Sequence, residues 1–332
     1  MTPTRSRRTA RLIAGAVAVG VLGLTGCGIE DRIVHLQPAP TENVAEGAPL
    51  RLEMAERIAE RVLTDVGAAE SSEERQEILV GSALRIAGAR MKLAEDTEAE
   101  TSEVSEPSAP AILAMTSGQE WPRAMLASAL DGPSQVRHLY VLVSTGPTDQ
   151  YKVHAMAPML GGTAVPYLGE FAEGASFEAA TAEEAIDASQ VMLDYAAGIT
   201  FPRPASVDSV AVNDPYAEAL NRNARAQADA LDDLGAVAQT HVPISDTVLS
   251  FTTPDGARVI FAQMVRTDRI ALSDAAKELQ IEDEVLQEIS GKEVVTTAFT
   301  AEFLENVVLV APPGAPAELI GAEEIVLRAS GE

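Results

Sequence analysis

The chain has 332 residues, of which 46% are hydrophobic, and its 24 Lys+Arg residues stand against 50 Asp+Glu residues, which gives a formal net charge of −26. This length is sufficient for about two domains, each with its own hydrophobic core. A surface as acidic as this one repels phosphate backbones, so the composition argues against nucleic acids as partners. The single cysteine excludes an intramolecular disulfide.

The first 26 residues have the pattern of a secretory signal peptide. Four arginines and no acidic residue precede an uncharged apolar run at residues 12–24, and this order is typical of such a peptide. The run is shorter than the ~20 residues that a membrane-spanning helix needs. It ends in Leu24, Thr25, Gly26 and Cys27, which resemble the lipobox of bacterial lipoproteins.

The resemblance to a lipobox implies a role for each of these four residues. The signal peptidase would recognise Leu24, Thr25 and Gly26, and Cys27 would become the new N-terminus, with a diacylglycerol on its thiol and an acyl group on its amino group. Two acyl chains make a stable anchor, whereas a single chain binds a membrane only reversibly. The alternative is secretion with cleavage elsewhere and a free Cys27.

Cleavage before Cys27 changes the charge of the expected mature protein. It removes four arginines and leaves 20 basic and 50 acidic residues, a net charge of −30. We expect this protein on the extracytoplasmic face of the cell membrane. Anionic lipid head groups repel an acidic surface, so we expect the folded part to stand away from the bilayer.

Residues 27–49 are expected to form a tether between the lipid and the folded part. They contain Pro38, Pro40 and Pro49 among polar residues, a composition typical of an extended linker. The apolar patch at residues 33–36 leaves a second arrangement open, in which this segment packs on the folded part.

Residues 50–175 are predicted to form a first module, in which helices precede antiparallel strands. Apolar residues at three- and four-residue spacing predict a helix over residues 50–66. Ser71 and Glu74 have the spacing of a capping box, which predicts the start of a second helix that continues to about residue 94. An acidic loop over residues 95–110 follows. Strands are then expected at residues 112–115, 138–144 and 151–157, the last two joined by a turn at residues 146–149.

Residues 176–332 repeat this order and are predicted to form a second module. Two helices come first, at residues 182–197 and 215–237, and a charged helical insertion is expected at residues 273–289. Helices followed by antiparallel strands indicate an α+β fold, here with two modules that each contain a curved antiparallel sheet. The strands of the second module are expected at residues 247–252, 257–265, 294–300, 306–310 and 324–327.

His138 and His154 are the first candidates for a metal site, because they lie on the two strands of one predicted hairpin. In a regular register their side chains point to opposite faces of the sheet. A one-residue slip places them on one face, but roughly 13 Å apart. Neither arrangement chelates one ion, so no metal ligand is predicted.

The sequence lacks the motifs of common catalytic and cofactor sites. It contains no nucleophile elbow and no phosphate-binding loop or dinucleotide fingerprint. An acylated Cys27 cannot act as a nucleophile, so no catalytic residue and no cofactor are predicted. A pair of carboxylates in one cleft stays open as an alternative, because fifty acidic residues are available and the required geometry is spatial. Such a pair would make the protein a hydrolase of envelope polymers.

Three further segments resemble an uncharacterised family of lipoproteins from high-GC Gram-positive bacteria, which carries a domain of unknown function. These segments are residues 28–38, directly after the lipobox, and residues 254–261 and 307–312. The resemblance implies an extracytoplasmic protein anchored to the membrane, and it supplies no catalytic residues. We therefore expect a non-enzymatic binding or scaffold protein of the cell envelope, whose partner is an envelope protein or an apolar ligand.

A bound apolar ligand requires a pocket, and Met115, Met156 and Met159 are candidates for its lining. Core packing is the more ordinary explanation of these methionines. A purely structural spacer is the third interpretation, and it predicts no pocket and no specific partner.

Overall fold

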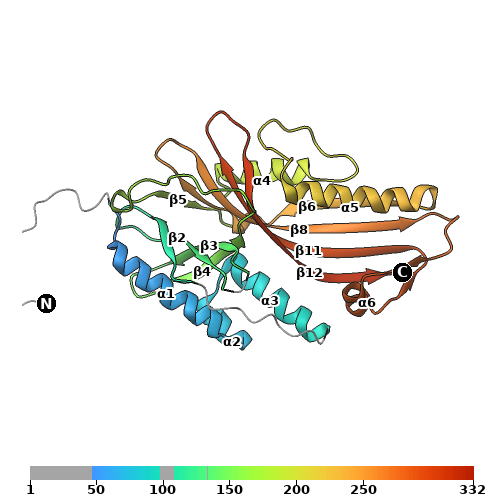
Figure 1. Cartoon of the computed structure of the whole chain (residues 1–332), viewed down its shortest axis with the longest axis horizontal. Coiled ribbons are helices and arrows are strands. Elements are labelled where there is room, and N and C mark those ends of the chain that lie inside the picture. Colours follow the sequence, from blue (N-terminus) through green and yellow to red (C-terminus); the bar gives the residue numbers. More distant parts are fainter. Residues whose placement is uncertain (1–46, 98–107, 133) are drawn as a thin grey trace, which may run out of the picture. The chain divides into compact units, whose positions relative to one another are not determined.

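A computed structural model of the chain describes residues 47–97, 108–132 and 134–332. Helices and antiparallel sheets make up this part of the chain (Figure 1), so the predicted α+β class is confirmed. All of these residues belong to one compact unit. The lipobox residues Leu24, Thr25, Gly26 and Cys27 lie outside the described residues, as does most of the predicted tether, and their assignments stay predictions.

The first sheet consists of four antiparallel strands in sequence order, with helices on one face (Figure 1). Its strands alternate between two environments. Met125 and Leu142 face the helices, whereas Leu126 and Val141 face the second sheet. The elements are α1 (Leu52–Ala68), α3 (Gly81–Asp96), β1 (Ala111–Met115), β2 (Arg123–Leu130), β3 (Arg137–Ser144) and β4 (Lys152–Pro158).

The second predicted helix is two helices in the structure. The capping box at its start is confirmed, because the Glu74 N–H donates to Ser71 Oγ at 3.2 Å and the Ser71 N–H donates to Glu74 Oε2 at 3.0 Å. Extended backbone follows α2 (Ser72–Ile78), and there the Val80 N–H donates to the Val153 carbonyl of β4 at 2.9 Å. The prediction of one helix to residue 94 is therefore wrong. Tertiary contact with the sheet outweighs helix propensity at this point.

The second sheet is built on three long strands, β8 (Arg258–Leu272), β11 (Ala298–Ala311) and β12 (Glu318–Gly331). β11 lies between the other two and pairs with both. β8 is long enough to pair with two strands in succession, with β7 through its first part and with β6 through its second part. The remaining strands are β5 (Ser176–Ala179), β6 (Gly235–Pro243) and β7 (Leu249–Thr252).

The strands predicted from the sequence are shorter than these three strands of the structure. It predicts two strands, at residues 294–300 and 306–310, where the structure has the single strand β11. Polar side chains interrupt the apolar pattern of all three long strands. In the structure such side chains pair across the sheet. For example, Arg328 Nη2 lies 2.6 Å from Glu302 Oε1. Cross-strand partners of this kind allow charged residues to continue a strand.

Two helices, α4 (Asp187–Gly198) and α5 (Pro215–Leu231), pack on β6 and β8. Both are shorter than predicted. The prediction of a helix to residue 237 is wrong, because the 3₁₀ turn Asp232–Leu234 ends α5 and the chain returns as β6. The side chains of β6 then alternate between buried and exposed positions, as expected for a strand with one covered face.

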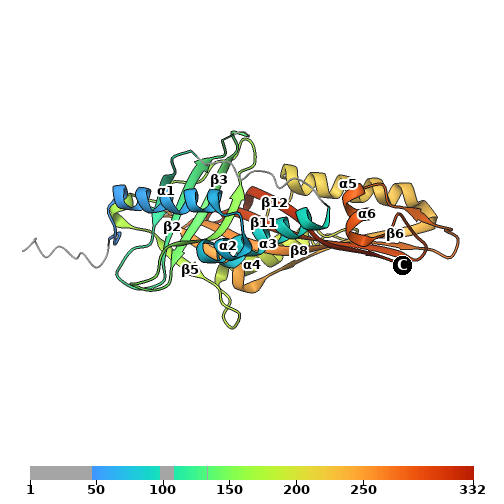
Figure 2. The same cartoon turned by 90° about the horizontal axis from the view of Figure 1, so that it is seen from below.

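The predicted helical insertion at residues 273–289 is only partly helical. It contains α6 (Glu284–Ser290). Asp283 caps the first turn of this helix, because its Oδ1 accepts a hydrogen bond from the Leu286 N–H at 3.0 Å. α6 lies at the β12 side of the long strands, and α5 runs along the β6 side (Figures 1 and 2). The short strands beside α6 are β9 (Leu279–Gln280) and β10 (Val294–Val295).

The two sheets share one hydrophobic core. Phe251 of β7 and Phe261 of β8 pack in the same cluster as Leu126 and Val141 of the first sheet. Phe251 is fully buried, and its ring centroid lies 4.9 Å from that of Phe177. Each sheet keeps helices of its own, as predicted, and the shared core joins both sheets within one compact unit.

Candidate functional site

A groove lies on the second sheet between α5 and the segment that contains β9 and α6. Its volume is about 620 Å³, which lies in the range of roughly 300–1,000 Å³ that is typical of small-molecule sites. Side chains of α5 form one wall, side chains of residues 279–286 form the other, and β8 and β11 provide the floor.

Strand alternation makes one end of this floor polar and the other end apolar. Every second residue of β8 faces the groove, so Arg266, Asp268 and Ile270 follow one another along the floor. In the antiparallel register Phe303 lies opposite Arg266, and Ala301 lies opposite Asp268. The charged side chains of the floor thus gather at the end away from α6, whereas Glu282 and Asp283 of the wall lie directly before α6.

The apolar end of the groove lies beside α6. Ile270 and Phe299 of the floor pack there with Leu279, Ile281 and Leu286 of the wall. Phe299 and Ile281 are buried, whereas the other three are only half-buried. The half-buried side chains leave apolar surface in contact with water, and an apolar ligand group would remove that surface from water favourably.

Arg266 is the centre of the polar end, with a side chain that is 5% exposed. Its Nε lies 3.2 Å from Asp268 Oδ2, its Nη1 lies 3.2 Å from Glu305 Oε1, and Nη1 also pairs with Glu324. Its Cζ lies 4.0 Å from the centroid of the Phe303 ring, a cation–π contact. Burial works to lower the pKa of Arg266, but the three carboxylates raise that pKa above its ordinary value, so the guanidinium stays charged.

Glu305 follows Phe303 on the same face of β11, next to Tyr216 of α5, and has no exposed side-chain surface. Its carboxylate accepts a hydrogen bond from the Tyr216 hydroxyl at 2.6 Å and lies 2.9 Å from His241 Nδ1. The same hydroxyl lies 3.0 Å from Glu324 Oε2 and so links the two carboxylates. Burial, and then the charges of Glu305 and Glu324, raise the pKa of Tyr216 far above its ordinary value, so its hydroxyl keeps its proton.

Gln239 contributes to the polar end from β6. It is 4% exposed, and its Nε2 donates to Asp268 Oδ1 at 2.8 Å. Its Oε1 is buried and accepts no hydrogen bond from the described residues. An unsatisfied buried acceptor costs about 1–3 kcal/mol. A ligand that donates a hydrogen bond to this oxygen would remove that cost.

Burial also raises the pKa of Asp268, although the guanidinium of Arg266 and the amide of Gln239 oppose the shift. The charged form of this carboxylate is thus incompletely compensated by its neighbours. A further positive or hydrogen-bonding group in the groove would stabilise the charged form.

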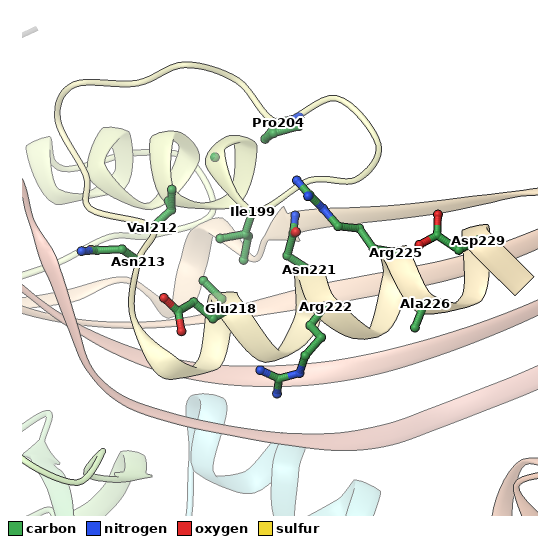
Figure 3. A pocket seen from close by; sticks show the side chains of 12 residues that line it. Ile199, Pro204, Val212, Asn213, Glu218, Asn221, Arg222, Arg225, Ala226 and Asp229 are labelled. Carbon is green, nitrogen blue, oxygen red and sulfur yellow. The ribbon is translucent and has the colours of Figure 1, made fainter.

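A second hollow, of about 640 Å³, lies on the opposite flank of α5, beside the loop that contains Pro204 (Figure 3). Its charged side chains are exposed, and Arg222 and Arg225 point in different directions (Figure 3). Among the described residues, no buried polar atom without a hydrogen-bond partner lines this hollow. The groove is therefore the stronger candidate for a binding site.

The structure places the two candidate histidines outside the groove. The regular register holds next to the turn, and a β-bulge at His154 then shifts the pairing of β3 with β4 by one residue. Both histidines therefore face the helices, as in the one-residue slip considered from the sequence. The His154 ring lies against Gly81 at the start of α3, and His138 stacks on Tyr140 with ring centroids 6.1 Å apart. Within the three described ranges, no group of three or more His, Cys, Asp or Glu side chains is arranged to hold a metal ion.

Sequence reasoning missed the groove. Met115, Met156 and Met159, the residues suggested for a pocket lining, pack in the hydrophobic clusters under the helices and between the sheets. The available signal is the charged pair Arg266 and Asp268 at alternate positions of β8. Strands with one solvent-exposed face also carry polar residues at alternate positions. This signal therefore does not distinguish a binding groove from an ordinary solvent-exposed sheet face.

The chain was compared with known proteins in three ways. A scan against protein-family models, a search of curated proteins and a search of solved structures found no match. None of the helices within the described part of the chain combines the length and the apolar character needed to cross a membrane.

Proposed function

We propose that this protein is an extracytoplasmic lipoprotein, anchored in the cell membrane through an acylated Cys27, and that it binds an amphipathic small molecule in the groove between α5 and α6. It acts as a binding protein and not as an enzyme. The observation that supports binding is a groove with one apolar end and one polar end, at which a buried acceptor receives no hydrogen bond from the part of the chain that the structure describes. The order of basic segment, apolar run and lipobox at the N-terminus supports the anchor.

A hydrolase of envelope polymers is the second candidate, since Asp268 and Glu324 line the same groove and burial raises the pKa of Asp268. A general acid must be positioned to give its proton to the substrate. Both carboxylates are instead ion-paired with Arg266, and Asp268 also accepts from Gln239. This pairing favours recognition over proton transfer.

Binding of the neutral dye Nile red tests the groove. The protein for this assay is the whole chain with Cys27→Ala, which removes the site of acylation. Asn223 and Asn221 offer a matched pair on α5, because Asn223 lines the groove and Asn221 lines the hollow of Figure 3. We expect Asn223→Trp to fill part of the groove and to weaken dye binding about tenfold. Asn221→Trp adds the same indole on the other flank and should leave the affinity unchanged.

Either of two results would contradict a binding function. If Nile red does not bind the whole chain, the spacer interpretation is preferred. If both tryptophan variants bind the dye as the unsubstituted chain does, the groove is not the binding site. Native mass spectrometry of the acylated protein, extracted from its own membrane, should in addition show a small molecule that the Asn223→Trp variant lacks.

A further inference from the structure

The charged side chains that line the groove are unequal in number. Among the described residues of the lining, one cation, Arg266, stands against four carboxylates, those of Asp268, Glu282, Asp283 and Glu324. The buried carboxylate of Glu305, which pairs with Arg266 on the same sheet face, adds to the excess of negative charge. Electrostatic attraction in a cleft of one sign raises the local concentration of ligands of the opposite sign.

The one cation of the lining does not form an anion site. Its guanidinium already pairs with three carboxylates, those of Asp268, Glu305 and Glu324, and it lies against the Phe303 ring. A phosphate or carboxylate head group would have to displace one of these partners, or approach the Nε, which makes no hydrogen bond with the described residues, against the charges of all three carboxylates. Removing one partner of a buried ion pair is strongly unfavourable.

An independent observation points to a hydrogen-bond donor in the ligand. Gln239 is 4% exposed, it lines the groove, and its Oε1 has no donor among the described residues. Its Nε2 is held by Asp268, and that contact orients the amide so that Oε1 is the unused atom. A donor from the ligand would therefore meet two acceptor types side by side, a neutral amide oxygen and a carboxylate.

We propose that the groove, in the binding role proposed above, selects amphiphiles whose head group is a primary ammonium and rejects those whose head group is a phosphate or a carboxylate. An ammonium has three N–H donors and no acceptor, which matches an acceptor-rich polar end. The chain of the amphiphile lies along Ile270, Phe299 and Leu286 at the apolar end. This inference rests on the proposed function, and the two are tested separately.

Isothermal titration with four amphiphiles of equal chain length tests the inference, again on the whole chain with Cys27→Ala. The probes are dodecylamine, dodecyltrimethylammonium, dodecyl maltoside and dodecanoate, each used below its micelle concentration. We expect dodecylamine to bind about tenfold more tightly than dodecyltrimethylammonium, which has the charge but no N–H donor. Dodecyl maltoside should bind more weakly still, and dodecanoate weakest of all.

Two carboxylate variants locate the charge effect. Glu282 and Glu288 are both exposed and lie close together in the sequence, but only Glu282 lines the groove. Glu282→Gln and Glu288→Gln therefore change the net charge equally, and we expect only Glu282→Gln to weaken dodecylamine binding, by about threefold. Asp268→Asn should weaken it by about tenfold. Urea unfolding of each variant confirms that the fold is intact.

The outcomes separate the two proposals. Dodecanoate binding as tightly as dodecylamine, with both lost in Asn223→Trp, would overturn the ammonium preference and keep the groove. Equal losses in Glu282→Gln and Glu288→Gln would also overturn the ammonium preference, because general surface charge would then explain the attraction. Absence of binding by all four probes would overturn the proposed function itself.

Discussion

Arg266→Met tests the polar end of the groove most directly. The substitution removes one guanidinium from Asp268, Glu305 and Glu324, while the flexible Met side chain fills much of the space. Glu305 has no exposed side-chain surface, so water cannot replace the lost partner. Removing one partner of a buried ion pair costs about 3–5 kcal/mol. We expect the free energy of unfolding to fall by that amount, from a typical total of about 5–15 kcal/mol.

Urea unfolding followed by circular dichroism measures this loss, at about pH 7.5 and about pH 5. A buried carboxyl without a cation has a folded-state pKa above its unfolded value, as burial already causes for Asp268 beside Arg266. Its contribution to stability is then complete below the unfolded pKa and is lost as the pH rises through the folded pKa. The penalty of Arg266→Met should therefore be larger at the higher pH.

Arg328→Met is the matched control, since it makes the same substitution on β12 of the same sheet. The Arg328 side chain is 71% exposed and pairs with Glu302, and exposed pairs of this kind contribute little to stability. The reasoning about Arg266 is wrong if both variants lose the same free energy, or if the loss in Arg266→Met grows toward acid pH.

Three other predictions concern the anchor and the core. Cys27→Ala should move the protein from the membrane fraction to the soluble fraction and remove the acyl mass from its N-terminus, and unchanged membrane association would contradict the lipobox assignment. Gly81→Ala should lower the free energy of unfolding by more than about 1 kcal/mol, and the thermal midpoint should fall with it. The reason is that Gly81 has φ +55° and that a Cβ there would overlap the His154 ring. Phe251→Ala should cost about 3–5 kcal/mol in urea unfolding, since Phe251 is fully buried between the two sheets, and a loss below about 1 kcal/mol would show that the shared core is loosely packed.

Local signals made part of the fold predictable. The capping box of Ser71 and Glu74 and the apolar spacing before it depend on residues within one or two helical turns. The hairpin of β3 and β4 follows in the same way from alternating apolar residues around a short turn. In these cases the residues that stabilise an element are its own sequence neighbours, so the pattern is visible in the chain.

The errors occur where the stabilising partner is distant in the sequence. Residues 235–237 continue the apolar spacing of α5, but they pair with the far end of β8 and become β6. The His154 bulge likewise depends on how β4 packs against α3, which contacts it at Gly81. Tertiary contacts override local propensity at such positions.

The groove was unpredictable for a related reason. Its polar end combines Gln239 of β6, Arg266 and Asp268 of β8, Glu305 of β11 and Glu324 of β12. β11 and β12 form a hairpin, but β6, β8 and β11 come from separate parts of the sequence. Each of these residues alone resembles an ordinary polar residue on a solvent-exposed sheet face. Only the register of the assembled sheet brings them together.

Buried charged groups at the polar end contribute less to the stability of the fold than apolar side chains would, and this loss is itself an argument for function. Replacing a buried ion pair by apolar residues of similar volume is often neutral or stabilising, and the adjacent floor positions, Ala301 and Ile270, are apolar. The chain nevertheless places Arg266 and Glu305 at nearly unexposed positions, and within the described ranges no group donates to the Gln239 Oε1 beside them. Packing does not require either feature. Departures from locally consistent design concentrate at functional sites, and the recognition of a hydrogen-bond donor that we propose for this end of the groove would use the unpaired Gln239 oxygen.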